Sequence, residues 1–542
     1  MLNIVLSAIN AKYVHSSLSV WVIAEGINSC SRYLHNVSVV EATINQKTSE
    51  IVDSIAEHKP DIIGISSYIW NAAILPELLM LLRKRLPDVI IVLGGPEATN
   101  NIDYWLLCGA DHVLPGEGEY VFSKFLDEYI SNNSDRKPDN PDYRDYLPVH
   151  DSKNETIDPY TDEYITSLNG RLSYIETSRG CPFQCTFCLS AGTGVRYFPL
   201  DTVKNQISVL SQSNTKTIKF VDRTFNCNPE RAYEIFDYVI KLDAKCTFHF
   251  EVAADLFNDE MLRILETAPP GRIQFEIGLQ SFYEPALKAA SRKSDIKKAV
   301  KNISALIKMQ NIHIHIDLIA GLPYETLPEF MTGFNRAYSL SAHHLQLGFL
   351  KLLHGSELRN KAKDFDIQYS PEPPYEIISS PWLSTEDLHT LKITENALQN
   401  TYNKGRFLSA LNYVLTVTGL QPFTLMHLLG SSVPNHGTQL ENYAIQLYEF
   451  FLTLSKVETS ALQDCMTCDW LTMVKGKNAP SFMKNKDTRR SQLSEVAEKV
   501  LGRKPKREEY SILNSGTGIF VDHTNKNPIT GLYRVYFIKT GE

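Results

Sequence analysis

The chain has 542 residues, of which 43% are hydrophobic and 21% charged, and its formal net charge is -8. This length accommodates three or four domains, no apolar run approaches the roughly 20 residues of a membrane span, and the acidic balance argues against binding to a nucleic-acid backbone. Basic runs at residues 484–490 and 503–507 are more typical of solvated surface. Nine scattered cysteines and an N-terminus without an export signal predict a reducing, cytoplasmic location.

Residues 1–135 predict an α/β domain. Apolar strands are expected at residues 3–8, 37–42, 62–68, 89–93 and 112–115, with amphipathic helices at 48–58 and 75–86. This alternation favours a parallel, Rossmann-like (flavodoxin-like) sheet that is covered on both faces. Ligands of such sheets bind outside the carboxyl ends of the strands. Here these ends carry Ser66, Ser67, Gly94, Gly95, Gly116, Glu117 and Gly118.

The glycines at these strand ends have two interpretations. They let the backbone approach a flat or bulky ligand closely, or they serve only the tight turns between strand and helix. No G-x-G-x-x-G run follows the first strand, so a dinucleotide is not expected. His15, in the loop after that strand, is a candidate ligand, although a loop histidine is more typical of the polar surface.

Residues 136–170 predict a linker because they begin in a polar, proline-bearing stretch without an apolar period. Alternation then resumes over residues 171–365. Six strands are expected, at 172–177, 217–221, 247–252, 272–279, 313–319 and 345–352, with helices at 229–241, 259–266, 295–309 and 327–339. Six β-α units in series predict a partial (β/α)6 TIM-type barrel, with chemistry at the carboxyl ends of its strands.

Three cysteines follow the first strand of this barrel. Cys181, Cys185 and Cys188 lie in the run ETSRGCPFQCTFC at residues 176–188. Three thiolates can hold a four-iron cluster and leave one iron open for another ligand. A zinc knuckle with a distant fourth ligand, or one face of a helix, would give the same spacing. Gly180 and Pro182 favour a turn, and no Cys or His pair follows at zinc-finger distance.

Residues 366–542 predict a separate, mostly α-helical domain. Helices are expected at residues 385–402, 406–418 and 440–458, and a small antiparallel β ending at 509–513, 518–522 and 531–538. Cys465 and Cys468 form a Cys-x-x-Cys pair within this domain. A redox pair or a second cluster is one interpretation, and two incidental thiols on a helix end are the more typical one.

The run at residues 176–188 resembles the radical S-adenosylmethionine (SAM) enzymes, and the preceding α/β domain resembles the subgroup with an N-terminal cobalamin-binding domain. Further signatures of the family follow in order as EIGLQS at residues 276–281, DLIAGLPYET at 317–326 and LLHGS at 352–356. The resemblance covers residues 1 to about 360 and leaves the C-terminal domain as a family-specific extension.

The resemblance implies that Cys181, Cys185 and Cys188 ligate a 4Fe-4S cluster whose open iron binds SAM. An electron from a donor such as flavodoxin or ferredoxin then yields a 5′-deoxyadenosyl radical, which takes a hydrogen atom from the substrate. SAM contacts are expected from Phe187, Asp222, Glu251, Ser281 and Gly321. Cobalamin contacts are expected from Ser66, Ser67, Gly94, Gly95, Glu117 and Gly118. No Asp-x-His-x-x-Gly motif is present, which implies base-off cobalamin without a protein imidazole, or a domain that has lost cobalamin.

We expect methyl transfer to carbon of a small molecule whose identity the sequence does not reveal. Rearrangement, reduction or ring closure without methyl transfer are alternatives. Methylthiolation of transfer RNA is another, but that class normally carries three further N-terminal cysteines, and here only Cys30 and Cys108 precede Cys181. A cobalamin or redox sensor without enzyme activity is the remaining hypothesis, and the intact three-cysteine loop weighs against it.

Overall fold

The computed structural model describes residues 1–131, 156–433, 439–477, 479–484 and 490–539. The chain divides into two compact units. The first comprises Met1–Thr267, Lys288–Lys293 and Leu350–Ser380, and the second comprises Ala268–Leu287, Ser294–Phe349 and Pro381–Glu542. Within the described part of the chain, no helix combines the length and the apolar character that crossing a membrane requires.

The first unit begins with a five-stranded parallel sheet in the order β2-β1-β3-β4-β5. Its strands are β1 (Asn3–Asn10), β2 (Asn36–Thr43), β3 (Ile62–Ser66), β4 (Ile90–Gly94) and β5 (His112–Leu114). All five predicted strands are therefore confirmed. Chain order reverses between β1 and β3, and such a reversal places the ligand crevice outside the carboxyl ends of these strands.

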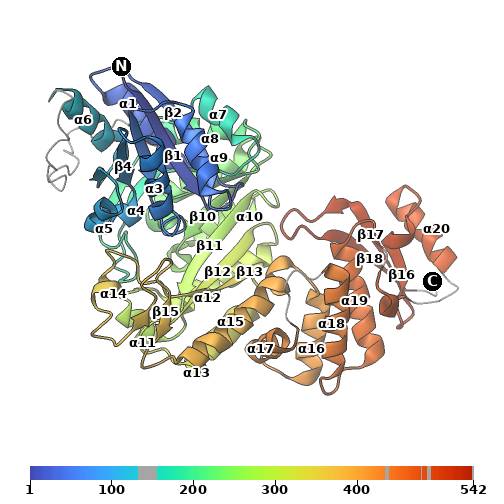
Figure 1. Cartoon of the computed structure of the whole chain (residues 1–542). Coiled ribbons are helices and arrows are strands. Elements are labelled where there is room, and N and C mark those ends of the chain that lie inside the picture. Colours follow the sequence, from blue (N-terminus) through green and yellow to red (C-terminus); the bar gives the residue numbers. More distant parts are fainter. Residues whose placement is uncertain (132–155, 434–438, 478, 485–489, 540–542) are drawn as a thin grey trace. The chain divides into compact units, whose positions relative to one another are not determined.

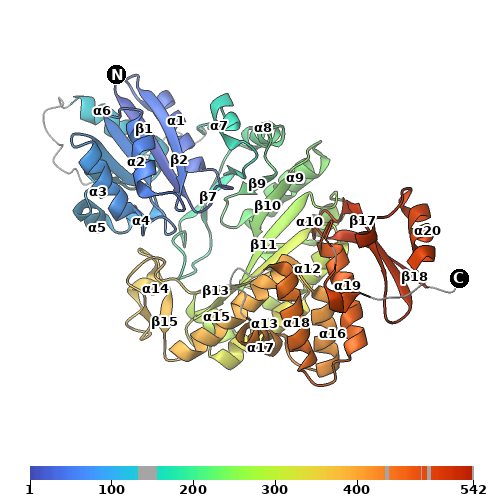
Figure 2. The same ribbon diagram turned by 45° about the vertical axis from the view of Figure 1, so that its right-hand side comes forward.

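Helices cover this sheet in two sets (Figures 1 and 2). The helix α2 (Thr48–Ala56) packs with α3 (Leu75–Arg85), and α1 (Leu18–Cys30) packs with α6 (Gly118–Ser131). Val5 and Ile9 of β1 join the core that contains α2 and α3. The short helices α4 (Pro96–Thr99) and α5 (Ile102–Leu107) follow β4. Helices α1 and α6 were not predicted from the sequence. Helix α1 has an almost continuous apolar run and no stripe, whereas α6 places Val121, Phe122, Phe125 and Leu126 at helical spacing, which was an available signal.

Gly26 allows α1 and α6 to approach each other closely. A Cβ atom added at Gly26 would lie 2.3 Å from the carbonyl oxygen of Glu119, which is inside any allowed contact. The close approach brings the start of α6, where Glu119 lies, against α1. Glycine is therefore required at this position by packing rather than by a turn.

The first unit continues with three parallel strands, β6 (Ser173–Ile175), β9 (Thr217–Phe220) and β10 (Thr247–Val252). Helices α8 (Leu200–Ser211), α9 (Pro229–Lys241) and α10 (Asp259–Glu266) connect or follow them. Between β6 and α8 the chain forms an antiparallel hairpin of β7 (Ser178–Cys181) and β8 (Gly194–Tyr197). Residues 136–155 of the predicted linker lie outside the described residues, and α7 (Asp162–Leu168) occupies its end.

The second unit contains β11 (Ile273–Gln280), β12 (His313–Ala320) and β13 (His344–Phe349), which are also parallel. Helices α12 (Ile296–Met309) and α13 (Leu327–Ser339) follow β11 and β12. All six strands predicted for the partial barrel are therefore present, three in each unit. The alternating burial along β11 puts Ile273, Phe275, Ile277 and Leu279 against the helices and leaves the intervening polar residues on the other face.

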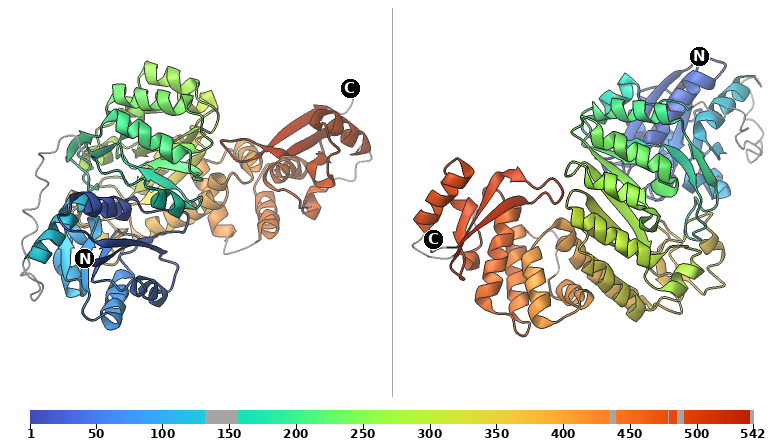
Figure 3. Two further views of the ribbon diagram at one scale, coloured as in Figure 1. Left: turned by 90° about the horizontal axis from the view of Figure 1, so that it is seen from above. Right: turned by 180° about the vertical axis from the view of Figure 1, so that it is seen from behind.

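The rest of the second unit is mostly helical and ends in a small antiparallel sheet (Figure 3). Its helices are α15 (Thr385–Asn400), α16 (Leu408–Thr418), α17 (Pro422–Ser432), α18 (Leu440–Leu452), α19 (Thr459–Met473) and α20 (Arg490–Leu501), and its strands are β16 (Tyr510–Ile512), β17 (Thr517–Lys526) and β18 (Tyr533–Lys539). The predicted helical domain with a β ending is confirmed, with α17, α19 and α20 as additions.

The predicted helix over residues 440–458 is too long, because α18 ends at Leu452 and α19 begins at Thr459. Cys465 and Cys468 lie inside α19 rather than at a helix end. Burial raises the pKa of Cys465 to about 11 and that of Cys468 to about 12, so both thiols stay protonated at neutral pH. Their environment is that of inert, partly buried thiols.

Candidate functional site

The three-cysteine loop is closed at its base by the β7–β8 hairpin. Cys181 is the last residue of β7 and pairs with Gly194 of β8. Gly180 has a φ of +99°, and an added Cβ would lie 1.9 Å from the carbonyl oxygen of Gly194. Only glycine fits such a position. The hairpin thus fixes where the loop begins and ends, and the predicted turn in place of a helix is confirmed.

The thiols of this loop are free and mostly buried. Cys181 is 8% exposed, Cys185 is 5% exposed and Cys188 is half-buried. Arg292 lies 3.6 Å from the sulfur of Cys185, and the hydroxyl of Thr224 lies 3.7 Å from that of Cys181. A cation and a hydroxyl beside sulfur atoms stabilise thiolates, which are the form that binds metal.

The donor set of this loop fits a 4Fe-4S cluster. Three thiols in one loop can hold a four-iron core and leave one iron open, whereas a structural zinc site needs a fourth protein ligand. Cys181, Cys185 and Cys188 are not in disulfides and supply these three thiols.

Asp222 anchors the chain just before this loop. Its carboxylate accepts hydrogen bonds from the Thr177 backbone N–H at 3.0 Å, the Thr177 hydroxyl at 2.7 Å and the Ser178 hydroxyl at 2.5 Å. Burial raises the pKa of Asp222 to about 6, and these hydrogen bonds oppose that rise. The structure thus shows Asp222 fixing the base of the cysteine loop, whereas the sequence indicated a contact to the methionyl amine.

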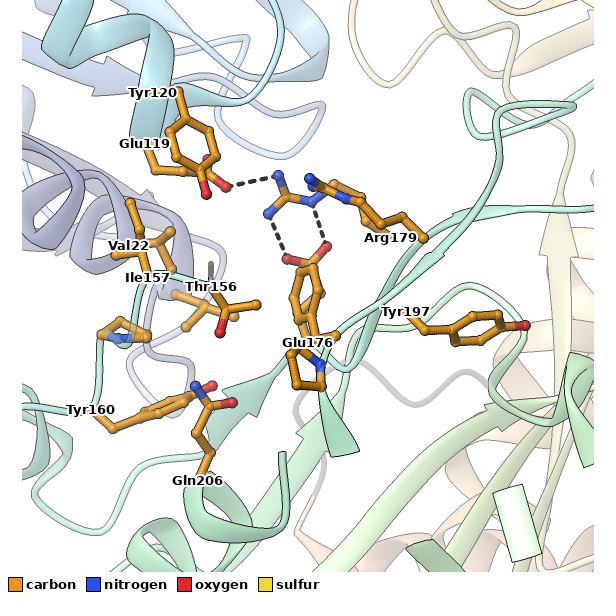
Figure 4. Close-up of a pocket in the computed structure, with 15 residues that line it drawn as sticks. Val22, Glu119, Tyr120, Thr156, Ile157, Tyr160, Glu176, Arg179, Tyr197 and Gln206 are labelled. Carbon is orange, nitrogen blue, oxygen red and sulfur yellow. Dashed lines mark hydrogen bonds and ion pairs between the residues drawn. The ribbon is translucent and has the colours of Figure 1, made fainter. Parts of the chain in front are cut away.

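Arg179 links the cysteine loop to the N-terminal domain (Figure 4). Its guanidinium donates to both oxygens of Glu176 at 3.0 and 2.7 Å and to Glu119 at 2.8 Å, and it lies 2.8 Å from Glu117. Arg196 of β8 donates to both oxygens of Glu117 at 2.7 Å. Although burial lowers it, the three carboxylates together raise the pKa of Arg179 above its usual value.

This network defines a common site for two segments that are distant in the sequence. Glu117 and Glu119 follow β5 of the N-terminal sheet, whereas Arg179 lies two residues before Cys181. Bidentate contacts between arginine and carboxylate fix orientation as well as distance. The network therefore sets the position of the cysteine loop relative to the carboxyl ends of β3, β4 and β5. The sequence named Glu117 only as a ligand contact and gave no sign of its ion pairs.

The loops after β3 and β4 pack tightly on each other. The hydroxyl of Ser67 donates to the carbonyl of Gly94 at 2.7 Å and accepts from the N–H of Ala98 at 2.8 Å. Gly95 has a φ of +95°, and an added Cβ would lie 2.5 Å from the carbonyl oxygen of Ser67. The hydroxyl of Ser66 is buried and has no hydrogen-bond partner among the described residues. This site combines a smooth glycine surface with an unused hydroxyl and thus fits a bulky polar ligand such as cobalamin.

His15 contributes to domain attachment. Its ring nitrogen Nδ1 lies 2.6 Å from the hydroxyl of Tyr174 in β6, and its carbonyl accepts from Arg171 at 3.1 Å. Arg171 also pairs with Glu41 of β2 at 2.8 Å, with both side chains 9% exposed. The geometry shows His15 holding the N-terminal domain to the start of the barrel. These contacts give His15 a structural role in place of the predicted role as a ligand.

The remaining predicted contacts of the first unit are more open. Phe187 is half-buried in the cysteine loop, and Glu251 of β10 lies 3.5 Å from the ammonium of Lys219 in β9. Asn226 is fully buried, and its amide both donates to the carbonyl and accepts from the N–H of Ala253, each at 2.9 Å. Asn226 thus ties together the segments that follow β9 and β10. An asparagine six residues after the end of a strand gives no sequence signal for such a tie.

In the second unit, Ser281 and Gly321 follow β11 and β12. The hydroxyl of Ser281 is 2% exposed, donates to Glu325 and accepts from the N–H of Tyr283 at 2.8 Å. Gly321 is buried with a φ of +102°. The side-chain oxygen of Gln280 is buried without a hydrogen-bond partner among the described residues. Gln280 therefore has unused hydrogen-bonding capacity beside Ser281, and the SAM contact from Ser281 stays a prediction.

The buried carboxyl of Glu325 predicts a stability that depends on pH. Burial raises its pKa from 4.5 to about 7, although the Ser281 hydrogen bond opposes this. The stabilising contribution of the neutral carboxyl is complete below about pH 4.5 and is lost as the pH rises through about 7. We expect Glu325→Gln to remove about 3 kcal/mol of this pH dependence between pH 5 and pH 8. Urea unfolding at both pH values measures it.

The exposed Glu449→Gln variant of α18 is the matched control for Glu325→Gln. In this control, the free energy of unfolding should change with pH as it does in the parent chain. Parallel pH profiles for the parent, Glu325→Gln and Glu449→Gln would contradict a buried, neutral Glu325.

One polar group on β11 and β12 was missed by the sequence analysis. Ligand atoms of Glu276, His315 and Asp317 all lie within 4.8 Å of one another. His315 and Asp317 alternate with buried apolar residues along β12, and Glu276 pairs in register with His315. The alternation of polar residues along both strands was the available signal, since it places these three side chains on one face.

Family models match three stretches of the chain. Residues 4–126 match the B12 binding domain, residues 175–334 match the radical SAM superfamily, and residues 363–515 match a protein of unknown function, DUF4080. The first stretch covers the five-stranded sheet, and the second contains the cysteine loop. The third covers most of the helices that follow the barrel strands.

Several named proteins and solved structures are similar to a large part of this chain. The cobalamin-dependent radical SAM methyltransferase TokK from Streptomyces tokunonensis is 23% identical over 381 residues, which cover 64% of this chain and 54% of TokK. This chain thus spans about half the length of that curated relative. The methyltransferase TsrM from Kitasatospora setae superposes with a TM-score of 0.52 at 16% identity, covering 69% of this chain and 80% of TsrM. The cobalamin-dependent radical enzyme OxsB gives a TM-score of 0.56 at 13% identity, with coverage of 86% and 78%. These superpositions confirm the predicted fold class.

Proposed function

Because the chain belongs to the radical SAM proteins that carry an N-terminal B12-binding domain, we propose that it is a methyltransferase that methylates carbon in a small molecule. One observation carries the proposal. Arg179 joins Glu117 and Glu119, at the carboxyl edge of the B12-binding sheet, to the strand that carries Cys181. A reaction that needs both cofactors in one place requires such a fixed link.

Three groups of residues would hold the cofactors. Cys181, Cys185 and Cys188 would ligate the 4Fe-4S cluster, and the loops with Ser66, Gly94 and Gly95 would hold cobalamin. The proposed contacts to SAM are Phe187, Asp222, Glu251, Ser281 and Gly321. When bound, these cofactors supply an organic radical and a transferable methyl group.

The chain's own residues position and shield this chemistry. Asp222 and Gly180 fix the cysteine loop, Arg292 places a cation beside Cys185, and the Arg179 network holds the two domains in register. Glu251 and Lys219 place opposite charges at neighbouring strands. Mostly buried thiols exclude water, as a strongly reducing cluster requires.

The proposal includes a domain division, a location and partners. We place the cobalamin-binding domain at residues 1–135, the linker at 136–170, the barrel at 171–365 and the C-terminal domain at 366–542. We place the protein in the cytoplasm, because nine scattered cysteines with one clustered triplet suit a reducing compartment better than a disulfide framework. A flavodoxin or ferredoxin would supply electrons. Nucleic acid is not part of the proposal, since the chain carries a formal net charge of -8.

Methylthiolation of transfer RNA is the second candidate, because one relative is named a tRNA-2-methylthio-N(6)-dimethylallyladenosine synthase at 22% identity. A second cluster in the N-terminal domain would need three thiols. Only Cys30 on α1 and Cys108 after α5 precede the cysteine loop, and Cys30 is exposed. The thiol count therefore favours methyl transfer.

An anaerobic assay tests the proposal. Reconstituted protein, reductant, cobalamin and methyl-labelled SAM are mixed with the small-molecule fraction of cells that lack the gene. We expect 5′-deoxyadenosine and S-adenosylhomocysteine in equal amounts, together with a labelled metabolite. Formation of deoxyadenosine alone would indicate rearrangement, reduction or ring closure. If neither deoxyadenosine nor S-adenosylhomocysteine forms, the sensor hypothesis is the one that remains.

A further inference from the structure

A cleft of about 570 Å³ lies in the first unit, apart from the residues assigned above. This volume matches sites for small organic molecules, which occupy about 300–1,000 Å³. One wall comes from the B12-binding domain, and the other from the chain that follows β13. Both walls are rich in aromatic rings. The residues that line the cleft include Tyr104, Trp105, His354, Arg359, Tyr369 and Tyr375.

Arg359 is the cation of this cleft. Its guanidinium stacks over the rings of Tyr369 at 5.0 Å and Tyr375 at 4.9 Å and donates one hydrogen bond, to the carbonyl of Leu352 at 2.5 Å. None of the ion pairs within 4.0 Å among the described residues involves Arg359, although the Glu97 carboxyl is near enough to interact with its charge. A guanidinium has five N–H donors in a planar fork that matches a carboxylate. Arg359 is thus held in place with donors to spare.

Three other ionisable groups lie in or beside the cleft. The carboxyl of Glu97, beside it, accepts from the hydroxyl of Tyr375 at 2.5 Å; burial raises its pKa, and the Tyr375 hydrogen bond and the charge of Arg359 oppose that rise. Burial and the charge of Arg359 lower the pKa of His354 to about 4, so its ring is neutral at pH 7. Glu372 is exposed at the rim. Arg359 is therefore the cation that an anionic ligand in the cleft would meet.

The cleft also offers a donor and flat surfaces. The indole N–H of Trp105 is buried without a hydrogen-bond partner among the described residues. Tyr104 packs edge-on against Trp105 with ring centroids 5.0 Å apart, and its side chain remains 45% exposed. His354 meets Tyr375 edge-on at 4.9 Å. Such rings bind planar groups by stacking.

Both walls are connected to the proposed cofactor sites. The N–H of Leu358, next to Arg359, donates at 2.8 Å to the carbonyl of Thr186, which follows Cys185. Tyr375 of the cleft donates to Glu97, which lies two residues after Gly95. A ligand in this cleft would therefore contact segments that are directly bonded to the cysteine loop and to the loop after β4.

We propose that this cleft binds the substrate, and that the substrate is a planar ring compound with a carboxylate that pairs with Arg359. This inference rests on the proposed function. The ring stacks on the aromatic walls, and a hydrogen-bond acceptor on the ligand receives the Trp105 N–H.

Calorimetric titration of the reconstituted holoprotein tests the proposal with indole-3-acetate and its uncharged counterpart indole-3-acetamide. We expect indole-3-acetate to bind at least about 10-fold more tightly. Arg359→Gln should abolish that preference, and Arg359→Lys should keep part of it, because the charge remains but the fork does not. The control Arg336→Gln removes an arginine stacked on Phe282 in the second unit and should change nothing.

Equal affinities for the two probes, or a preference that survives in Arg359→Gln, would overturn the cleft assignment. This failure is separate from failure of the proposed function. If labelled metabolite forms at an unchanged KM in Arg359→Gln, the proposed methyltransferase function is supported and the assignment of the cleft as the substrate site is wrong. If the acid binds through Arg359 but SAM is never cleaved, the cleft is an acid-binding site and the enzymatic proposal falls.

Discussion

Replacement of Cys181, Cys185 or Cys188 by alanine is expected to reduce 5′-deoxyadenosine formation by at least about 1,000-fold. Each thiol is one of three ligands, and two sulfur atoms cannot hold a four-iron core with a single open iron. The loop itself, residues 181–193, carries no fourth cysteine that could substitute. Anaerobic product analysis together with iron content per chain measures the effect.

Cys465→Ala is the matched control for these three variants. Cys465 is also partly buried, but it lies inside α19 in the second unit. It should retain iron and activity. A Cys185→Ala variant that binds a full complement of iron and cleaves SAM at the parental rate would contradict the assignment of this loop.

Arg179→Gln is expected to lower the free energy of unfolding and to uncouple methyl transfer from deoxyadenosine formation. The substitution leaves Glu117, Glu119 and Glu176 facing one another without their central cation, at a cost of about 3 kcal/mol. The cysteine loop then loses its fixed distance from the B12-binding sheet. We therefore expect methyl transfer to fall at least about 10-fold more than deoxyadenosine formation, because a misplacement of about 1 Å costs proximity.

The ratio of S-adenosylhomocysteine to deoxyadenosine in single-turnover reactions measures this uncoupling. Arg196→Gln is the control, since Arg196 binds Glu117 alone and is more exposed. It should change the ratio little. The double variant Arg179→Gln with Glu119→Gln should recover stability but not coupling. If Arg179→Gln behaves like Arg196→Gln in both measurements, the network is a surface feature without a positioning role.

Much of the fold could be predicted because apolar periodicity is a local property. The five strands of the first sheet and the six of the barrel follow from runs of buried residues whose period is written in the sequence. Helices α1 and α6 were not predicted, although α6 carries apolar residues at helical spacing. Their close packing could not be predicted, because it depends on a contact between Gly26 and the Glu119 backbone, which lie 93 residues apart in the sequence.

Part of the candidate site could be predicted from the sequence, and part could not. The cysteine loop could be predicted because its ligands lie within eight residues. Asp222, Glu117 and Ser281 were indicated as cofactor contacts from their places after strands, yet their side chains bond to Thr177, Arg179 and Glu325. Hydrogen-bond partners far apart in the chain are set by tertiary packing, and position after a strand does not reveal them.

Mössbauer spectroscopy of protein reconstituted with 57Fe shows whether Cys181, Cys185 and Cys188 hold a cluster with an iron open to SAM. We expect about four irons per chain in a 4Fe-4S cluster, with one iron site altered when SAM is added. A site filled by zinc at full occupancy, or an iron spectrum that SAM leaves unchanged, would contradict it.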